Sequence, residues 1–178
     1  MTQQPSLRIL LQCHSFLACN LELANRLCDS NMVQISTIGF ELEPYAGEFD
    51  RFIDSRIQCH KWASVRLRSA TYYSHRLQLL KLAKEADIIH CQCNTDPILN
   101  PIMLWWLNHT KAPSILTVHD PKPHSGEDIL RKKQWVRTAI SDKLISRHPN
   151  LLNYSQYSAQ LMREYYPLAG SHTSGSVS

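Results

Sequence analysis

The sequence predicts an α/β protein with a doubly wound, mostly parallel, Rossmann-like sheet in a single domain. Short apolar runs typical of buried strands recur along the chain, and apolar residues at helical spacing fill the segments between them. The length of 178 residues, 43% of them hydrophobic, suffices for one domain with a core but not comfortably for two. We expect the domain to span residues 1–170, followed by a disordered Ser/Gly-rich tail at 171–178.

The chain opens with a predicted β-α-β unit. Residues 7–13 and 32–38 are apolar or β-branched runs typical of buried strands. Between them, Leu17, Leu21, Ala24 and Cys28 recur at the spacing of a helix that lies on a sheet. The first half of the chain therefore starts as an α/β protein should.

The pattern weakens over residues 40–68, where we expect loops and one short strand near residues 56–59. Helical periodicity returns over 72–86, and Tyr73, Leu77 and Leu80 form the predicted core-facing stripe. The basic residues of this helix, Arg76, Lys81 and Lys84, are expected to face water. Residues 87–93 then predict another buried strand.

The second half continues the alternation. Asn100 and Pro101 are a good helix start, and the helix they open is apolar on nearly every side. Such a helix is typically buried between a sheet and a neighbouring helix, although a contact surface for a second domain or a membrane is the alternative. We further expect a strand at 114–118, a helix at 127–148, a strand at 150–154, and a last helix to residue 166, with Ser155 as its N-cap.

Charge and cysteine content limit the class of protein. The net charge of +4 is spread over several segments, which disfavours nucleic acid as a partner and suits an anionic small molecule or lipid headgroup equally well. Six cysteines lie before residue 94 in no disulfide-like framework, and no charged-then-apolar leader begins the chain. We expect a cytoplasmic protein. No apolar run approaches the roughly 20 residues that span a bilayer, so any membrane contact would be peripheral.

Several common sites are disfavoured. The loop after the first strand, HSFLACN, has no glycine to let backbone amides approach a phosphate, and no Gly-x-Ser-x-Gly sequence occurs. His90, Cys91 and Cys93 crowd one predicted strand, but His90 should point to the face opposite the two cysteines. We therefore expect no metal site there. The other isolated histidines are expected at the surface or at helix ends: His60, His75, His109 and His148.

The loop TVHDPKPHSGED, residues 117–128, is the strongest candidate site. It follows a buried strand, and ligands of open parallel sheets bind beyond the carboxyl ends of the strands. We predict His119 and Asp120 as catalytic residues. The alternative is that Asp120 caps local amides and His119 bonds a neighbouring carbonyl. Predicted substrate-binding residues come from this loop and from the loop after the first strand: His14, Ser15, His124 and Glu127.

Four segments together resemble the N-terminal domain of glycosyltransferase family 4: LELANRL, ADIIHCQ, PSILTVHDPKPHSGED and NLLNYSQYSAQLM. The resemblance implies the GT-B fold, in which two Rossmann-like domains face each other across a cleft. It also implies retaining transfer of a sugar from a nucleotide-sugar donor to a glycan or lipid-linked acceptor, usually without a bound metal or other cofactor. By position, His119 would line the cleft near the transferred sugar, with Asp120 beside it.

The chain departs from this family in two ways. The family often has a glycine pair in the first loop, where this chain has Leu17, Ala18 and Cys19. The 178 residues also leave no room for the nucleotide-sugar-binding C-terminal domain. The resemblance therefore implies the acceptor-side half of an enzyme, inactive without a donor-binding domain or subunit, in the cytoplasm or at the inner face of a membrane. The alternative is a non-catalytic Rossmann-like binding or interaction module.

Overall fold

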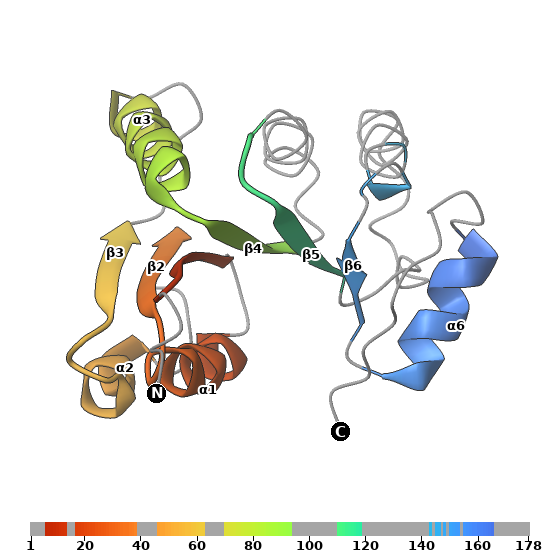
Figure 1. Cartoon of the computed structure of the whole chain (residues 1–178), viewed down its shortest axis with the longest axis horizontal. Helices are drawn as coiled ribbons and strands as arrows, with labels where there is room; N and C mark the ends of the chain where they lie inside the picture. The colour runs from red at the N-terminus through yellow and green to blue at the C-terminus, as the bar shows by residue number, and fades with distance from the viewer. Residues whose placement is uncertain are drawn as a thin grey trace. The chain divides into compact units, whose positions relative to one another are not determined.

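The computed structural model describes residues 6–13, 17–38, 46–62, 70–93, 110–118, 143, 145, 146, 148, 150–153 and 155–165. Strands and helices alternate along most of this part of the chain (Figure 1). In chain order the elements are β1 (Arg8–Cys13), α1 (Leu17–Leu27), β2 (Met32–Ile38), α2 (Ala46–Phe52), β3 (Gln58–Trp62), α3 (Ala70–Glu85), β4 (Ile88–Cys93), β5 (Ser114–Val118), β6 (Leu151–Leu152) and α6 (Gln156–Tyr165).

The described strands form a six-stranded sheet in the order β3-β2-β1-β4-β5-β6. β1 pairs in parallel with β2 and with β4, β2 pairs in parallel with β3, and β5 pairs in parallel with β6. This is the strand order of Rossmann-like proteins. The predicted α/β, Rossmann-like fold is confirmed. The chain divides into two compact units, residues 1–91 with 111–113 and residues 92–110 with 114–178.

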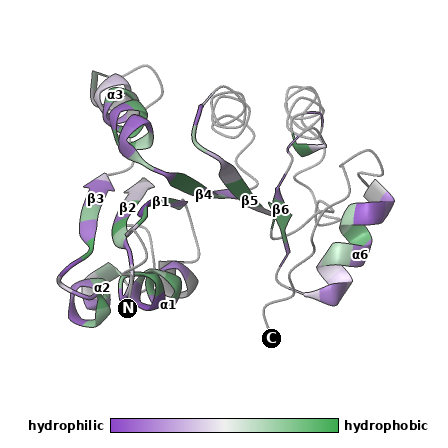
Figure 2. Ribbon diagram, viewed as in Figure 1, coloured by the Kyte–Doolittle hydropathy of each residue, from purple (hydrophilic) through white to green (hydrophobic). Residues whose placement is uncertain are grey.

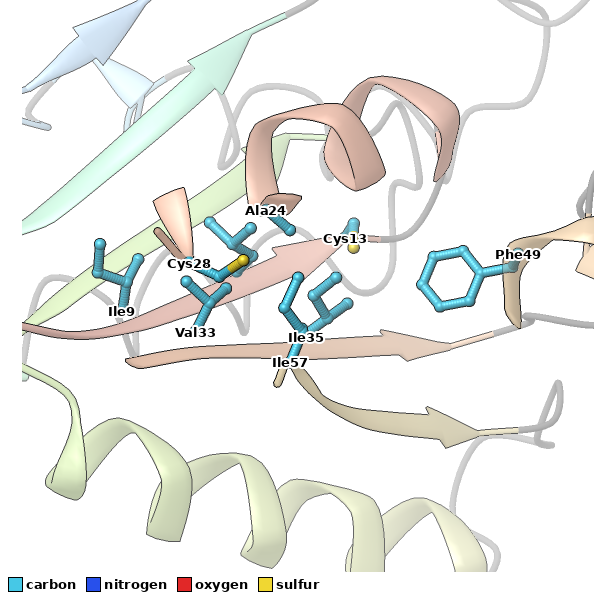
Figure 3. Packing of buried hydrophobic residues seen from close by; sticks show 9 residues of the cluster. Ile9, Cys13, Ala24, Cys28, Val33, Ile35, Phe49 and Ile57 are labelled. Carbon is cyan, nitrogen blue, oxygen red and sulfur yellow. The ribbon is translucent and has the colours of Figure 1, made fainter. Parts of the chain in front are cut away.

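In the first unit, one face of the sheet packs against α1 and α2 (Figure 3). Alternate residues of β1 and β2 point to this face because side chains alternate along a strand. Leu21 and Ala24 of α1, and Cys28 directly after it, pack against them, as their helical spacing predicts. Each fully buried aliphatic side chain contributes about 1.5–3 kcal/mol to folding. The buried cluster comprises Ile9, Leu11, Cys13, Ala24, Cys28, Val33, Ile35, Phe49 and Ile57.

α3 covers the other face of the first unit's sheet (Figure 1), but not with the predicted side. Tyr73, Leu77 and Leu80 are exposed, so the predicted core-facing stripe is wrong. The helix carries hydrophobic residues on more than one side (Figure 2), and two stripes therefore compete for the sheet. The stripe that packs on the sheet consists of four buried residues, His75, Leu79, Leu82 and Ala83. Lys81 and Lys84 are exposed as predicted, and the side chain of Arg76 lies outside the described residues.

The segment between β2 and α3 holds more structure than its pattern predicts. The expected strand exists as β3, displaced by two residues, and pairs with β2 from Gln34↔Gln58 to Ile38↔Trp62. α2 was not expected, since it has only seven residues and buries only Phe49, which is too little for a helical period. Tertiary contacts hold it in place. Asn25 Nδ2 donates to the carbonyl of Phe52 at 2.7 Å, and the Asp54 amide donates to Asn25 Oδ1 at 2.9 Å.

The second unit contains the pair β5 and β6, with Leu116↔Leu151 in register, and the helix α6. The predicted N-cap is confirmed, because Ser155 Oγ accepts a bond from the Ser158 amide at 3.0 Å. α6 begins at the next residue and ends one residue before the predicted end. Its buried side carries Ala159 and Met162.

Several predictions lie outside the described residues. They concern the helix that starts at Asn100, the loop beyond Val118, most of the helix at 127–148, His109 and the tail at 171–178. Among the helices in the described part of the chain, none has the length and apolar character required to cross a bilayer.

Candidate functional site

The six residues proposed from sequence as catalytic or substrate-binding all lie outside the described residues: His14, Ser15, His119, Asp120, His124 and Glu127. The strand that precedes the loop is described. β5 is buried at Leu116, Thr117 and Val118, and it ends directly before His119 in the sequence. These six assignments therefore remain predictions, and the described residues present a separate candidate site.

That site is a line of polar side chains across the sheet of the first unit. Gln12 is the register partner of Ser36, and Ser36 is the register partner of His60. Paired residues of parallel strands point to the same face, so these three side chains lie side by side over about 10 Å. We call Gln12, Ser36, His60 and the following inward residue of β3, Trp62, the polar row. It lies toward the carboxyl ends of β1, β2 and β3, where ligands of open α/β sheets bind.

Two residues of α3, His75 and Gln78, cover the polar row. His75 Nε2 lies 3.5 Å from Ser36 Oγ, and Gln78 Nε2 lies 2.8 Å from His60 Nδ1. The Trp62 ring meets the His75 ring edge-on, with centroids 5.0 Å apart and planes at 68°. The row is thus enclosed between the sheet and one helix, and Ser36 and His75 are almost completely buried.

Gln12 is the unusual member of the row. The residue is 1% exposed, yet neither Nε2 nor Oε1 has a hydrogen-bond partner among the described residues. A buried polar group without a partner costs about 1–3 kcal/mol, so most native structures avoid it. Within the same described ranges, Trp62 Nε1 and His60 Nε2 are likewise buried without a hydrogen-bond partner. Four buried polar atoms of β1 and β3 therefore have unused hydrogen-bonding capacity within the described part of the chain.

The hydrogen-bonding character of these atoms follows from their chemistry. An amide nitrogen only donates, so His60 Nδ1 accepts from Gln78 and the ring proton sits on Nε2. Burial lowers the pKa of His60, which keeps the ring neutral at pH 7. The row then offers three donors, at Gln12, His60 and Trp62, and one acceptor at Gln12 Oε1. Uncharged donors and acceptors beside an aromatic ring suit a hydroxyl-bearing ligand.

A second polar cluster, in the second unit, has a structural role. His148 Nε2 lies 2.9 Å from Ser114 Oγ, and His148 Nδ1 lies 3.0 Å from the Asn150 carbonyl. Asn150 Nδ2 in turn donates to the Ser114 carbonyl at 3.0 Å. A serine bonded to a histidine is also a nucleophile arrangement, but both side chains are buried at the amino end of β5. The cluster joins the start of β5 to the segment that leads into β6.

The structure corrects the expectation that isolated histidines lie at the surface or at helix ends. His75 is fully buried within α3, and His60 is half-buried on β3. His148 is also fully buried, although it lies at the end of a helical segment, as expected. For His75 the sequence does hold a signal, because it precedes Leu79 and Leu82 by four and seven residues and so shares their helix face. No sequence pattern identifies Gln12 as a site residue, because only the strand register places it beside Ser36 and His60.

The strand β4 carries His90, Cys91 and Cys93 close together in sequence. His90 pairs with Leu11 and Cys91 pairs with Gln12, which confirms that the two side chains point to opposite faces. The side chain of Cys93 lies outside the described residues. Within the described ranges, no group of three or more histidine, cysteine or acidic side chains is placed to hold a metal ion.

Comparison with known proteins finds no family model that matches the chain and no curated protein that resembles it.

Proposed function

We propose that this chain is the acceptor-side domain of a family 4, GT-B glycosyltransferase. In this role it takes part in retaining transfer of a sugar from a nucleotide sugar to a glycan or lipid-linked acceptor. The observation that carries the proposal is the polar row at the carboxyl end of a parallel sheet, with uncharged donors and acceptors beside the Trp62 indole. Sugar hydroxyls both donate and accept hydrogen bonds, and a sugar ring packs well against an aromatic face.

The uncharged row favours the acceptor over the donor. A nucleotide diphosphate is recognised by cations, by glycine-rich loops or by helix N-termini. Gln12, Ser36 and Trp62 carry no charge at any physiological pH, and burial disfavours the charged form of His60. A separate donor-binding domain or subunit would then bind the nucleotide sugar, and His119 and Asp120 would act in the cleft between the two. No metal is required, and a lipid-linked acceptor would place the domain at the cytoplasmic face of a membrane.

A binding experiment tests the proposal. In amide-resolved NMR of the full chain, a panel of methyl glycosides should shift the signals of Gln12, Ser36 and Trp62, whereas UDP-glucose should leave them unchanged. His119→Ala should weaken glycoside binding without changing the melting temperature. Shifts with UDP-glucose alone, or with no member of the glycoside panel, would contradict the acceptor-side role.

A non-catalytic sugar-binding module is the second candidate, and one distance favours it. The 3.5 Å between Ser36 Oγ and His75 Nε2 exceeds the roughly 2.6–3.2 Å expected when a base activates a hydroxyl. The row is thus built for binding, and any chemistry must come from other residues. If glycosides bind with the same affinity to the His119→Ala variant and to the unaltered chain, the module is the better description.

A further inference from the structure

The outward side of α3 exposes three large apolar residues in a line. Tyr73 is 55% exposed, Leu77 is 67% exposed and Leu80 is 38% exposed. They are spaced by four and three residues, so they lie one above the other along one side of the helix. Single exposed apolar residues are ordinary, but a continuous apolar stripe marks an interaction surface.

The packing of α3 on the sheet does not require this stripe. The side of α3 that faces the sheet is already complete, because His75, Leu79, Leu82 and Ala83 are buried there. Rotation of the helix to hide Tyr73 and Leu77 would expose these four residues instead. The outward stripe is therefore exposed in addition to, and not in place of, the side of α3 that packs on the sheet.

Basic residues accompany the stripe. Lys81 and Lys84 are exposed, and at about 100° per residue both fall within about 40° of Leu77 around the helix. The only acidic residue among the 16 of α3 is Glu85, at the C-terminal end and about 80° from Leu77. We call Tyr73, Leu77, Leu80, Lys81 and Lys84 the outward face.

We propose that the outward face of α3 binds the surface of a membrane that contains anionic lipids. Leucines insert at the boundary of the acyl chains, tyrosine prefers the headgroup level, and lysines bind lipid phosphates. A helix of 16 residues, about 24 Å long, lies flat on such a surface. The attachment is peripheral and does not depend on the proposed transferase role.

A second copy of the chain fits this face poorly. In a two-fold symmetric dimer the outward face would meet itself, so two positively charged faces would repel each other. The face has no carboxylate within its stripe to compensate that repulsion. An anionic lipid surface neutralises both lysines at once.

Vesicle sedimentation of the full chain tests the proposal. The chain should bind vesicles of phosphatidylcholine mixed in equal parts with phosphatidylglycerol, bind phosphatidylcholine alone weakly, and dissociate at high salt. Leu77→Ser should lower the partition coefficient at least about tenfold, since an exposed leucine loses its apolar burial in the bilayer. Lys81→Gln should lower it roughly fivefold.

Two variants serve as matched controls. Tyr157→Ser removes an apolar side chain that is 71% exposed on α6, and Lys111→Gln removes an exposed lysine outside α3. Neither should change the partition coefficient, and all four variants should keep the wild-type circular dichroism spectrum. Equal binding to both kinds of vesicle, or equal loss with the control variants, would overturn the proposal. So would a dimer that Leu77→Ser dissociates in the absence of any vesicle binding.

Discussion

Ser36 Oγ on β2 and His75 Nε2 on α3 lie 3.5 Å apart in the interior of the first unit, at the outer limit of a hydrogen bond. This contact shows that α3 meets the sheet in two different ways. Leu79 and Leu82 are held by apolar burial, whereas His75 and Gln78 contact polar side chains of the sheet. Polar contacts require matched hydrogen-bond donors and acceptors. We therefore expect a ligand or a change of pH to affect these polar contacts rather than the aliphatic ones.

His60 provides a prediction about pH. Burial lowers its pKa below the ordinary value of 6.5. As the pH falls through 6.5, His60 therefore becomes protonated in the unfolded chain before it does so in the folded protein. The free energy of unfolding decreases as a result. His60→Gln removes this difference in proton uptake. The melting temperature of the variant should fall less than that of the unaltered chain between about pH 7.5 and about pH 5.5. Parallel curves would show that His60 titrates alike in both states.

Asn25 provides a prediction about the missed helix. Its side chain bonds the Phe52 carbonyl at the end of α2 and the Asp54 amide in the following turn. Asn25→Ala removes both bonds and should lower the free energy of unfolding by roughly 1–2 kcal/mol, measured by urea denaturation. Gln160→Ala, which removes a single exposed bond to Glu164, is the control and should cost less than about 0.5 kcal/mol. An equal effect of both substitutions would mean that Asn25 does not hold α2.

The local pattern predicted β1, β2, β4, β5, α1 and α6, because a buried strand or a one-sided helix needs no knowledge of its neighbours. It selected the wrong side of α3, because that helix has two apolar stripes and only the sheet decides between them. It missed α2, whose seven residues are held mainly by Asn25 and Phe49. The local sequence pattern did not predict the polar row either. Gln12, Ser36 and His60 become neighbours only through strand register, which no single segment encodes.

The pair of Arg8 and Asp87 provides a prediction about acid stability. Asp87 Oδ2 accepts the Arg8 amide at 2.8 Å, and Asp87 Oδ1 accepts from the guanidinium at 3.2 Å. These bonds lower the pKa of Asp87 below 3.8, so its contribution is complete above that value and is lost as the pH falls through the folded pKa. Asp87→Asn should be less stable near neutral pH and lose less stability between about pH 5 and about pH 2. Glu22→Gln, which breaks an exposed ion pair with Arg26, should follow the unaltered chain.

Gln12 provides the sharpest prediction, since stability and binding should change in opposite directions. Gln12→Leu replaces two buried, unbonded polar atoms with methyl groups of similar volume. The free energy of unfolding should rise by about 1–3 kcal/mol, and the glycoside-induced NMR shifts at Ser36 and Trp62 should disappear. Gln34→Leu is the matched control on the neighbouring strand, because the Gln34 amide already bonds Gln58 at 2.8 Å. It should leave glycoside binding intact and give no such gain in stability. If Gln12→Leu instead destabilises the protein by a comparable amount, the Gln12 amide is held by ordered water in the free protein, and the polar row is a hydrated part of the core.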